Sequence, residues 1–420
     1  MMKRRKITAI LGAVCVSCAT MCVSAKVSYR FGEPFGGCWY APQQPALSLT
    51  TINKGSVVEC DSITLRVATD RGESVYSFTQ RVNIEPGDSS VLSYSFSLNP
   101  GFYKCVFSAG DSVIRRYTIG YEPERIVTLS DEQSDYDAFW AKAKAELAEV
   151  APDYTMVEDT ALHSAHRKGY HVTMKSLGGE LLRCYLLMPK KKGKHPAIIH
   201  FQGYNSGPWA PNADANPDYI EFVLSVRGQG WNKPYNTHGV WLTENLDDAN
   251  NYYYRGAYMD VVRGIDFVTQ LPEYDGVNLF AEGHSQGGLL TLVSAAFDDR
   301  VVAAAPSCPF LGDIPSYLDL GSDYVKQLLR QAFAEQNITV EQFERNVSYF
   351  DLKNLCKRIK VPVFMAVGLQ DPICQPYTNF VGYNAIRSPK KFIIYPEQQH
   401  STDKAHWEPA QIQFFESNRK

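Results

Sequence analysis

The sequence predicts two folded domains: an all-β sandwich, followed by an α/β domain built on a doubly wound, mostly parallel sheet. Short alternating runs separated by turn residues fill residues 26–122, which show almost no helical period. Over residues 123–420, apolar runs rich in Val and Ile alternate with helical patterns, which is typical of parallel strands buried on both faces. A length of 420 residues also exceeds what one ordinary hydrophobic core accommodates.

The composition narrows the function classes. A formal net charge of −3 gives no sign of a nucleic-acid partner or of binding to an anionic membrane. Hydrophobic residues make up 45% of the chain, which is typical of a globular protein rather than a disordered one. Beyond the first residues, no segment is long and apolar enough to predict a membrane span.

Residues 1–25 have the pattern of a signal peptide. Four basic residues at positions 3–6 precede an apolar run from Ile7 to Val23, and Val23-Ser24-Ala25 has the small side chains of a cleavage site. We therefore expect cleavage after Ala25 and a secreted or periplasmic protein. A membrane anchor is the alternative, although the run is short and contains Ser, Thr and Cys. Lipid anchoring also stays open, because three cysteines lie in or near the run: Cys15, Cys18 and Cys22.

Residues 26–122 predict an immunoglobulin-like β-sandwich. Tyr103 follows the turn Asn99-Pro100-Gly101 and precedes Cys105 by two residues, which is the tyrosine-corner pattern of such domains. Cys60 ends an earlier predicted strand, so a Cys60–Cys105 disulfide and two buried free thiols are both open. Seven cysteines follow residue 25, and this odd number leaves at least one thiol free or bonded to another molecule. None of the seven forms a Cys-x-x-Cys motif, so no metal or redox site is predicted.

The α/β domain is expected to begin with a linker and a helix. Glu122-Pro123-Glu124-Arg125 has the composition of a linker, and apolar residues recur at helical spacing from Tyr136 to Val150. Ser130 and Gln133 have the spacing of a capping box for this helix. Later apolar runs predict strands at 194–203, 219–228, 278–283, 301–308, 361–368 and 390–396, with helices at 258–271, 289–297, 324–334 and 377–386.

One glycine-rich stretch, Gly283-His284-Ser285-Gln286-Gly287, lies between a predicted buried strand and a predicted helix. This context is typical of a nucleophile elbow, in which a serine with positive φ holds its hydroxyl clear of the sheet. The flanking glycines avoid clashes of a Cβ atom with the neighbouring strand and helix. The N-terminus of the following helix favours a developing oxyanion, and the backbone N–H of Gln286 supplies one donor. The alternative is a purely structural glycine-rich turn.

A nucleophilic serine needs a base and a group that orients the base. Asp371 follows the strand predicted at 361–368, and His400 follows the next one, in the order nucleophile, acid, base. The carboxyl ends of parallel strands lie at one edge of a sheet, so we expect Ser285, Asp371 and His400 to meet there. The alternative interpretation of each residue by itself is structural: Asp371 as a turn or helix-cap residue and His400 as a surface-loop residue. Asp403 and His406 are weaker candidates, since they lie further from the strand end.

The loop after the strand at 194–203 is expected to supply a second oxyanion donor, the backbone N–H of Tyr204, with Gly203 allowing a tight turn. The alternative is a simple connecting loop. Four aromatic residues in the loops over the sheet edge are candidates for stacking on sugar rings, or else for core or lid packing: Trp209, Trp231, Tyr235 and Trp241.

Four stretches of the α/β domain form a combined pattern: Gly203-Tyr204-Asn205, Arg227-Gly228-Gln229-Gly230, Tyr252-Tyr253-Tyr254-Arg255-Gly256 and Gly283-His284-Ser285-Gln286-Gly287. The Arg-Gly-Gln and Ser-Gln-Gly pair is more specific than Gly-x-Ser-x-Gly alone. With this combination, the chain resembles the acetyl xylan esterase / cephalosporin C deacetylase family over residues 128–420.

This resemblance implies an α/β-hydrolase fold and deacetylation of short acetylated xylo-oligosaccharides and of cephalosporin C, with neither metal nor cofactor. It also implies Ser285 as nucleophile, His400 as base and Asp371 as partner of the base. The N–H groups of Tyr204 and Gln286 would form the oxyanion hole.

The sequence departs from the family pattern in three places. Ser401 follows His400, where the family usually has Glu. The segment 230–251 is shorter than usual in a region that contributes to a hexamer in the family, so the oligomeric state is not predicted. The sandwich is no part of the usual family chain.

The expected activity is that of a secreted serine carboxylesterase that deacetylates acetylated xylo-oligosaccharides or related acetylated sugars through an acetyl-serine intermediate. A small acetylated saccharide is the expected partner, without nucleic acid or a stable membrane span after signal cleavage. One alternative is a peptidase or dienelactone-type hydrolase, because a fold does not decide between these activities. The other is a catalytically inactive glycan-binding or adhesion protein, against which the presence of all three polar residues argues.

Overall fold

The computed structural model describes residues 26–32 and 37–420. The signal-peptide prediction concerns residues 1–25 and lies outside the described residues. Within the described ranges, no helix combines the length and the apolar character that crossing a membrane requires.

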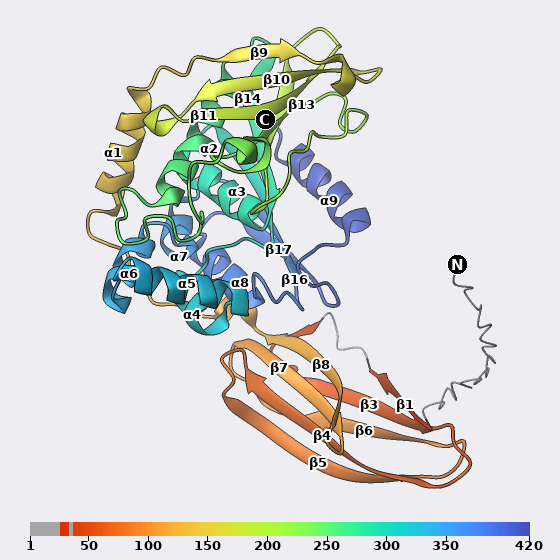
Figure 1. Cartoon of the computed structure of the whole chain (residues 1–420). Helices are drawn as coiled ribbons and strands as arrows, with labels where there is room; N and C mark the ends of the chain where they lie inside the picture. Colours follow the sequence, from red (N-terminus) through yellow and green to blue (C-terminus); the bar gives the residue numbers. More distant parts are fainter. Residues whose placement is uncertain (1–25, 33–36) are drawn as a thin grey trace, which may run out of the picture.

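The N-terminal region is all-β, as predicted, and forms two sheets (Figure 1). All strand pairs are antiparallel except β2 with β8. Alternate side chains from both sheets form one apolar core, which includes Leu49, Ile63 and Ile119. The three-stranded sheet is β1 (Val27–Phe31), β3 (Ala46–Asn53) and β6 (Ser89–Ser95). The five-stranded sheet is β2 (Cys38–Trp39), β8 (Ser112–Tyr121), β7 (Gly101–Ala109), β4 (Glu59–Thr69) and β5 (Ser74–Ile84).

The cysteine predictions for this region are corrected by the strand register. Cys105 on β7 lies opposite Val67 on β4, seven residues from Cys60. At about 3.4 Å per residue the two cysteines are about 24 Å apart along the sheet, too far for a disulfide. Cys60 is exposed and Cys105 buried, so the alternative of two buried thiols is also wrong for Cys60. The seven cysteines from Cys38 to Cys374 are all free thiols.

The α/β domain is built on a nine-stranded sheet in the order β17-β16-β15-β14-β12-β13-β11-β10-β9. The prediction of a mostly parallel sheet is confirmed. The parallel strands are β12 (His195–Phe201), β13 (Ile220–Leu224), β14 (Tyr274–His284), β15 (Val301–Ser307), β16 (Val363–Gly368) and β17 (Lys390–Tyr395).

Three antiparallel strands extend this sheet at one end and were not predicted: β9 (Thr155–Glu158), β10 (Arg167–Lys175) and β11 (Leu181–Pro189). All four residues of β9 are exposed, and buried and partly exposed residues mix along β10. β9 and β10 therefore lack the continuous apolar runs that predict strands buried on both faces, whereas β11 is mostly buried.

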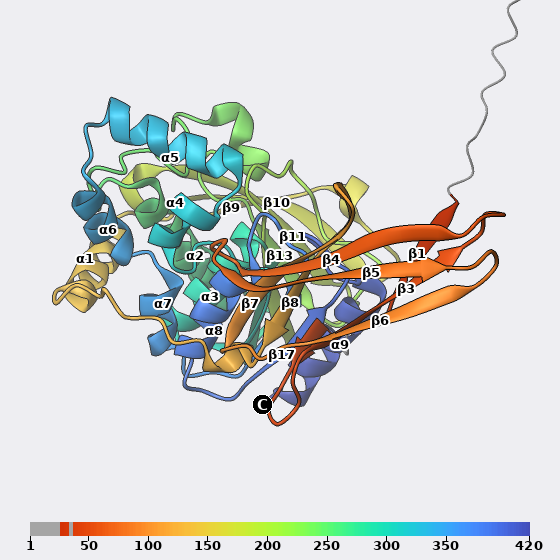
Figure 2. The same cartoon turned by 90° about the horizontal axis from the view of Figure 1, so that it is seen from below.

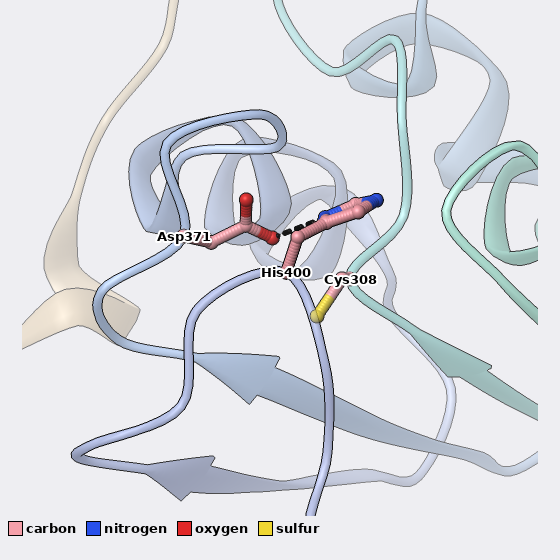
Figure 3. A group of neighbouring side chains, drawn as sticks. All are labelled: Cys308, Asp371 and His400. Atoms are coloured by element: carbon pink, nitrogen blue, oxygen red, sulfur yellow. Dashed lines mark hydrogen bonds and ion pairs between the residues drawn. The ribbon is translucent and has the colours of Figure 1, made fainter. Parts of the chain in front are cut away.

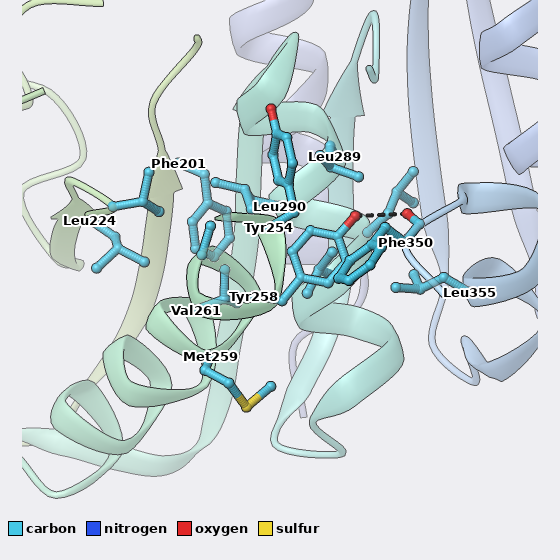
Figure 4. Packing of buried hydrophobic residues seen from close by; sticks show 14 of the residues in the cluster. Phe201, Leu224, Tyr254, Tyr258, Met259, Val261, Leu289, Leu290, Phe350 and Leu355 are labelled. Carbon is cyan, nitrogen blue, oxygen red and sulfur yellow. Dashed lines mark hydrogen bonds between the residues drawn. The ribbon is translucent and has the colours of Figure 1, made fainter. Parts of the chain in front are cut away.

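Helices cover both faces of the sheet (Figure 1). One face packs against α2 (Tyr253–Thr269) and α3 (Gln286–Phe297), and the other packs against α9 (Lys404–Ser417). Figure 4 shows apolar side chains of α2 and α3 packed beside Phe201 and Leu224 of the sheet. The other helices are α1 (Tyr136–Ala148), α4 (Tyr317–Leu320), α5 (Asp323–Glu335), α6 (Val340–Ser348), α7 (Leu352–Leu355) and α8 (Pro376–Ala385).

The starts of α2 and α3 and the cap of α1 differ from prediction, and α3 begins at Gln286, three residues before the expected 289. α2 begins at Tyr253, five residues before the expected 258. The sequence did not predict these first residues as helical, because the helix is buried almost all round and shows little amphipathic pattern there. The predicted capping box does not form, since Asp135 precedes α1 and makes no side-chain cap. Ser130 instead donates to Asn354 Oδ1.

The two domains share an apolar contact. Figures 1 and 2 place β7 and β8 of the sandwich beside α8 and the ends of β16 and β17. The rings of Phe102 on β7 and Phe380 on α8 lie 5.5 Å apart. Buried residues from both domains form one cluster here: Cys38, Phe102, Met365, Val367, Leu369, Phe380 and Tyr383.

Candidate active site

Ser285 lies on the sharp turn between β14 and α3. Its φ is +62°, the positive value expected of a nucleophile elbow. A Cβ atom on Gly283 would lie 2.6 Å from the Gly287 backbone, and one on Gly287 would lie 2.1 Å from Phe201 O on β12. Both positions therefore require glycine. As expected, a side chain at 283 would clash with the following helix, and one at 287 would clash with the neighbouring strand.

The structure brings Ser285, His400 and Asp371 into one hydrogen-bonded chain. His400 Nε2 lies 2.9 Å from Ser285 Oγ, and His400 Nδ1 lies 2.7 Å from Asp371 Oδ2. Figure 3 shows Asp371 and His400 pointing toward each other from the loops after β16 and β17. The other carboxylate oxygen of Asp371 accepts from the N–H groups of Ile373 and Cys374, at 2.8 and 2.9 Å. These two donors hold the carboxylate in one orientation.

The two weaker candidates lie elsewhere. Asp403 accepts from Ala405 N–H at the start of α9. His406 Nδ1 lies 3.1 Å from the hydroxyl of Tyr395. Neither residue hydrogen-bonds to Ser285, Asp371 or His400 in the described part of the chain.

The titratable side chains next to the hydrogen-bonded Ser285, His400 and Asp371 are neutral. Burial, with the neighbouring His400, lowers the pKa of His284 to about 4. Burial raises the pKa of the Cys308 and Cys374 thiols above the usual value. Cys308, Asp371 and His400 carry potential metal ligands within 4.8 Å of one another (Figure 3). The Cys308 thiol stays protonated, and His400 Nδ1 and Asp371 already bond to each other, so this group fits an acid–base pair better than a metal site.

The two predicted oxyanion donors border the same turn. Gln286 is the first residue of α3, and Tyr204 follows β12. Within residues 26–32 and 37–420, the backbone N–H groups of both residues have no hydrogen-bond acceptor. A Cβ atom on Gly203 would lie 3.6 Å from His284 O, so the loop before Tyr204 runs beside the elbow.

Gln229 connects the segments that carry the two predicted oxyanion donors, a contact that the sequence did not predict. Its Nε2 donates to the side-chain oxygen of Gln286 at 3.0 Å, and its Oε1 accepts from Asn205 N–H at 2.9 Å. The hydroxyl of Tyr254 also donates to the side-chain oxygen of Gln286, at 3.0 Å. The Arg-Gly-Gln motif was the available sequence signal, but only the fold shows what the glutamine contacts.

Arg227 of the same motif is held by a buried carboxylate. Its Nε and terminal nitrogen donate to Asp260 on α2, at 3.0 and 2.7 Å. Burial alone would lower the pKa of Arg227, but Asp260 more than offsets this, so the pKa lies above its usual value. A Cβ atom on Gly256 would lie 2.1 Å from Arg227, which explains the glycine of the Tyr-Arg-Gly stretch. Asp260 is a further residue that the sequence reasoning missed.

All four candidate aromatic side chains have a ring or a cation as a partner within the protein. The ring of Trp231 stacks on Tyr185 at 4.8 Å, and Arg183 covers the ring of Tyr235 at 3.6 Å. Trp241 is buried edge-on against Tyr204. Trp209 is 38% exposed and meets His200 edge-on, and Tyr235 is 56% exposed although Arg183 covers one face, so these two rings keep exposed surface.

Comparison with known proteins identifies the family to which the chain belongs. A family profile described as "Acetyl xylan esterase (AXE1)" matches residues 124–418. The chain is 28% identical over 328 residues to acetyl esterase Axe7A of Xylanibacter ruminicola, a match that covers 74% of each protein.

Two solved structures are similar to the α/β part. Acetyl xylan esterase 1 from Thermoanaerobacterium sp. has a TM-score of 0.65 and 29% identity, over 71% of this chain and 98% of that one. An acetyl xylan esterase from Paenibacillus sp. R4 has a TM-score of 0.65 and 28% identity, over 70% and 98%. The chain therefore belongs to the acetyl xylan esterase (AXE1) family and is a carbohydrate esterase of the α/β-hydrolase serine-esterase type.

Proposed function

We propose that the protein removes acetyl groups from acetylated xylo-oligosaccharides or related acetylated sugars. The observation that carries this proposal is the hydrogen-bonded chain from Ser285 Oγ through His400 to Asp371. The names of the similar proteins, acetyl esterase and acetyl xylan esterase, support the acetyl group as the acyl part.

His400 Nε2 takes the Ser285 proton as the hydroxyl oxygen attacks the acetyl carbonyl. Asp371 stabilises the resulting imidazolium, and the N–H groups of Gln286 and Tyr204 bind the oxyanion. Each such donor is typically worth about 3 kcal/mol of barrier. The imidazolium then protonates the departing sugar oxygen, which leaves an acetyl-serine. His400 next activates a water molecule, which attacks this ester and releases acetate and the free serine.

The surroundings of Ser285 suit a small acyl group. Ser285 is only 9% exposed, and the buried Cys374 and the half-buried His284 lie close to the triad. On the sugar side, the exposed rings of Trp209 and Tyr235 are the candidates for stacking on a sugar.

We also propose a secreted or periplasmic location, supported by the composition of residues 1–25. The sandwich is proposed to be immunoglobulin-like. The Tyr103 hydroxyl donates to Asn99 O at 2.7 Å, and this hydrogen bond is the one that a tyrosine corner requires.

Acetate release from acetylated xylo-oligosaccharides and from 4-nitrophenyl acetate tests the proposal. We expect turnover of both, and Ser285→Ala should abolish it while the melting temperature stays within a few degrees. A folded protein that is inactive on both esters and unlabelled by a fluorophosphonate probe would favour an adhesion role. Cleavage of a chromogenic dipeptide amide would favour a peptidase.

A further inference from the structure

Strand β8 of the sandwich has an open edge facing the loop that holds Asp371. In the described part of the chain, β2 pairs with β8 only at Gly120 and Tyr121. The side-chain amide of Gln370 occupies the next position along this edge. Its Oε1 accepts from Thr118 N–H at 2.7 Å, and its Nε2 donates to Thr118 O at 3.0 Å. A carboxamide is therefore bound as the peptide group of a neighbouring strand would be.

Gln370 also joins the acid loop to the base loop. Its Nε2 donates to Pro396 O at 2.8 Å, and its backbone N–H donates to Gln398 O at 2.9 Å. Gln370 directly precedes Asp371, and Gln398 lies two residues before His400. Gln370, which directly precedes the acid, thus contacts both the sandwich and the segment before the base through its side chain.

Other sandwich residues contact the same two loops. The Tyr117 hydroxyl donates to Pro396 O at 3.3 Å, and Arg115 lies 3.2 Å from both carboxylate oxygens of Glu397. Glu397 is largely exposed, so this ion pair is expected to add little by itself. A Cβ atom on Gly37 would lie 2.2 Å from the Leu369 side chain, which shows how closely the sandwich approaches the loop.

These loops have little other support on that side. β17 is the last strand of the nine-stranded sheet, so no further strand of the α/β domain flanks the base loop there. The segment from Pro396 to the start of α9 at Lys404 contains no helix or strand. A misplacement of about 1 Å at a reacting group can lower a rate about 100-fold.

We propose that Gln370 is a positioning residue through which the docked sandwich sets the distance and angle between His400 and its two partners. This inference rests on the proposed esterase activity. The sandwich then does more than extend the chain, because full turnover requires its β8 edge against Gln370.

Gln370→Met in the full-length chain tests this, since methionine keeps the length of the side chain and removes its hydrogen bonds. We expect kcat for 4-nitrophenyl acetate to fall about 10- to 100-fold, with KM within twofold. The rate of fluorophosphonate labelling of Ser285 should fall in parallel. Gln80→Met, on the exposed edge strand β5, is the matched control and should leave both rates unchanged.

A second variant changes only the sandwich: Arg115→Met combined with Tyr117→Phe. We expect a roughly threefold lower kcat at unchanged KM, and this variant decides the question if Gln370→Met does not fold. A folded Gln370→Met protein with kcat within twofold of the wild type overturns the proposal, as does a loss confined to KM. A wild-type chain that neither turns over the ester nor labels at Ser285 refutes the proposed function instead.

Discussion

Asp371→Asn should misplace one proton and thereby stop the reaction. The amide oxygen of the new side chain is the acceptor that the N–H groups of Ile373 and Cys374 require, so the amide nitrogen must face His400. That nitrogen donates to His400 Nδ1, and the imidazole proton then has to sit on Nε2. Nε2 would donate to Ser285 Oγ, where the reaction needs it to accept.

The size of the effect follows from this wrong tautomer. The same change in the triad of a serine protease lowers kcat about 10⁴-fold. At about 1.36 kcal/mol per factor of ten, this is about 5.4 kcal/mol of transition-state stabilisation. Because the backbone donors at residues 373 and 374 leave the amide a single favourable orientation, we expect the full loss here.

The assay is the steady-state hydrolysis of 4-nitrophenyl acetate at pH 7, with thermal melts of both proteins. Asp403→Asn is the matched control, since asparagine also caps helices, and its kcat should equal that of the wild type. A folded Asp371→Asn protein that retains more than a tenth of the wild-type kcat would refute the assigned role of Asp371.

Three further predictions concern the surroundings of the site. Gln229→Met should lower kcat about tenfold, measured with 4-nitrophenyl acetate, because the Gln286 amide and Asn205 N–H lose a buried partner. Gly287→Ala should cost about 1–3 kcal/mol in urea unfolding, since its Cβ would lie 2.1 Å from a backbone oxygen. Burial alone would lower the pKa of His200, but the carboxylates of Glu282 and Glu221 raise it to about 10. The stability from this charge is fully present below pH 6.5 and lost as the pH rises through about 10, so urea midpoints should fall over that window. His200→Gln should cost about 3–5 kcal/mol at pH 7 and remove this pH dependence.

The sequence predicts some parts of the fold and of the candidate site and not others. Parallel strands can be predicted from apolar runs in the sequence, because both of their faces are buried. The antiparallel strands β9 and β10 cannot, because β9 is exposed and β10 mixes buried with partly exposed residues. Ser285, Asp371 and His400 were singled out because each follows a predicted strand, and the ends of parallel strands meet at one edge.

By itself, the sequence determined what depends on neighbours along the chain. The pair of glycines around Ser285 and the order of strands and helices are such features, because they reflect local sterics and periodic burial. Only the tertiary structure decided which distant groups meet. It separated Cys60 from Cys105, gave Ser130 the partner Asn354 in place of a cap, and set Gln229 between two loops. It also placed Thr118 of the sandwich against Gln370, 252 residues along the chain. Such contacts leave no periodic trace in the sequence, since their geometry arises only when separately formed elements pack together.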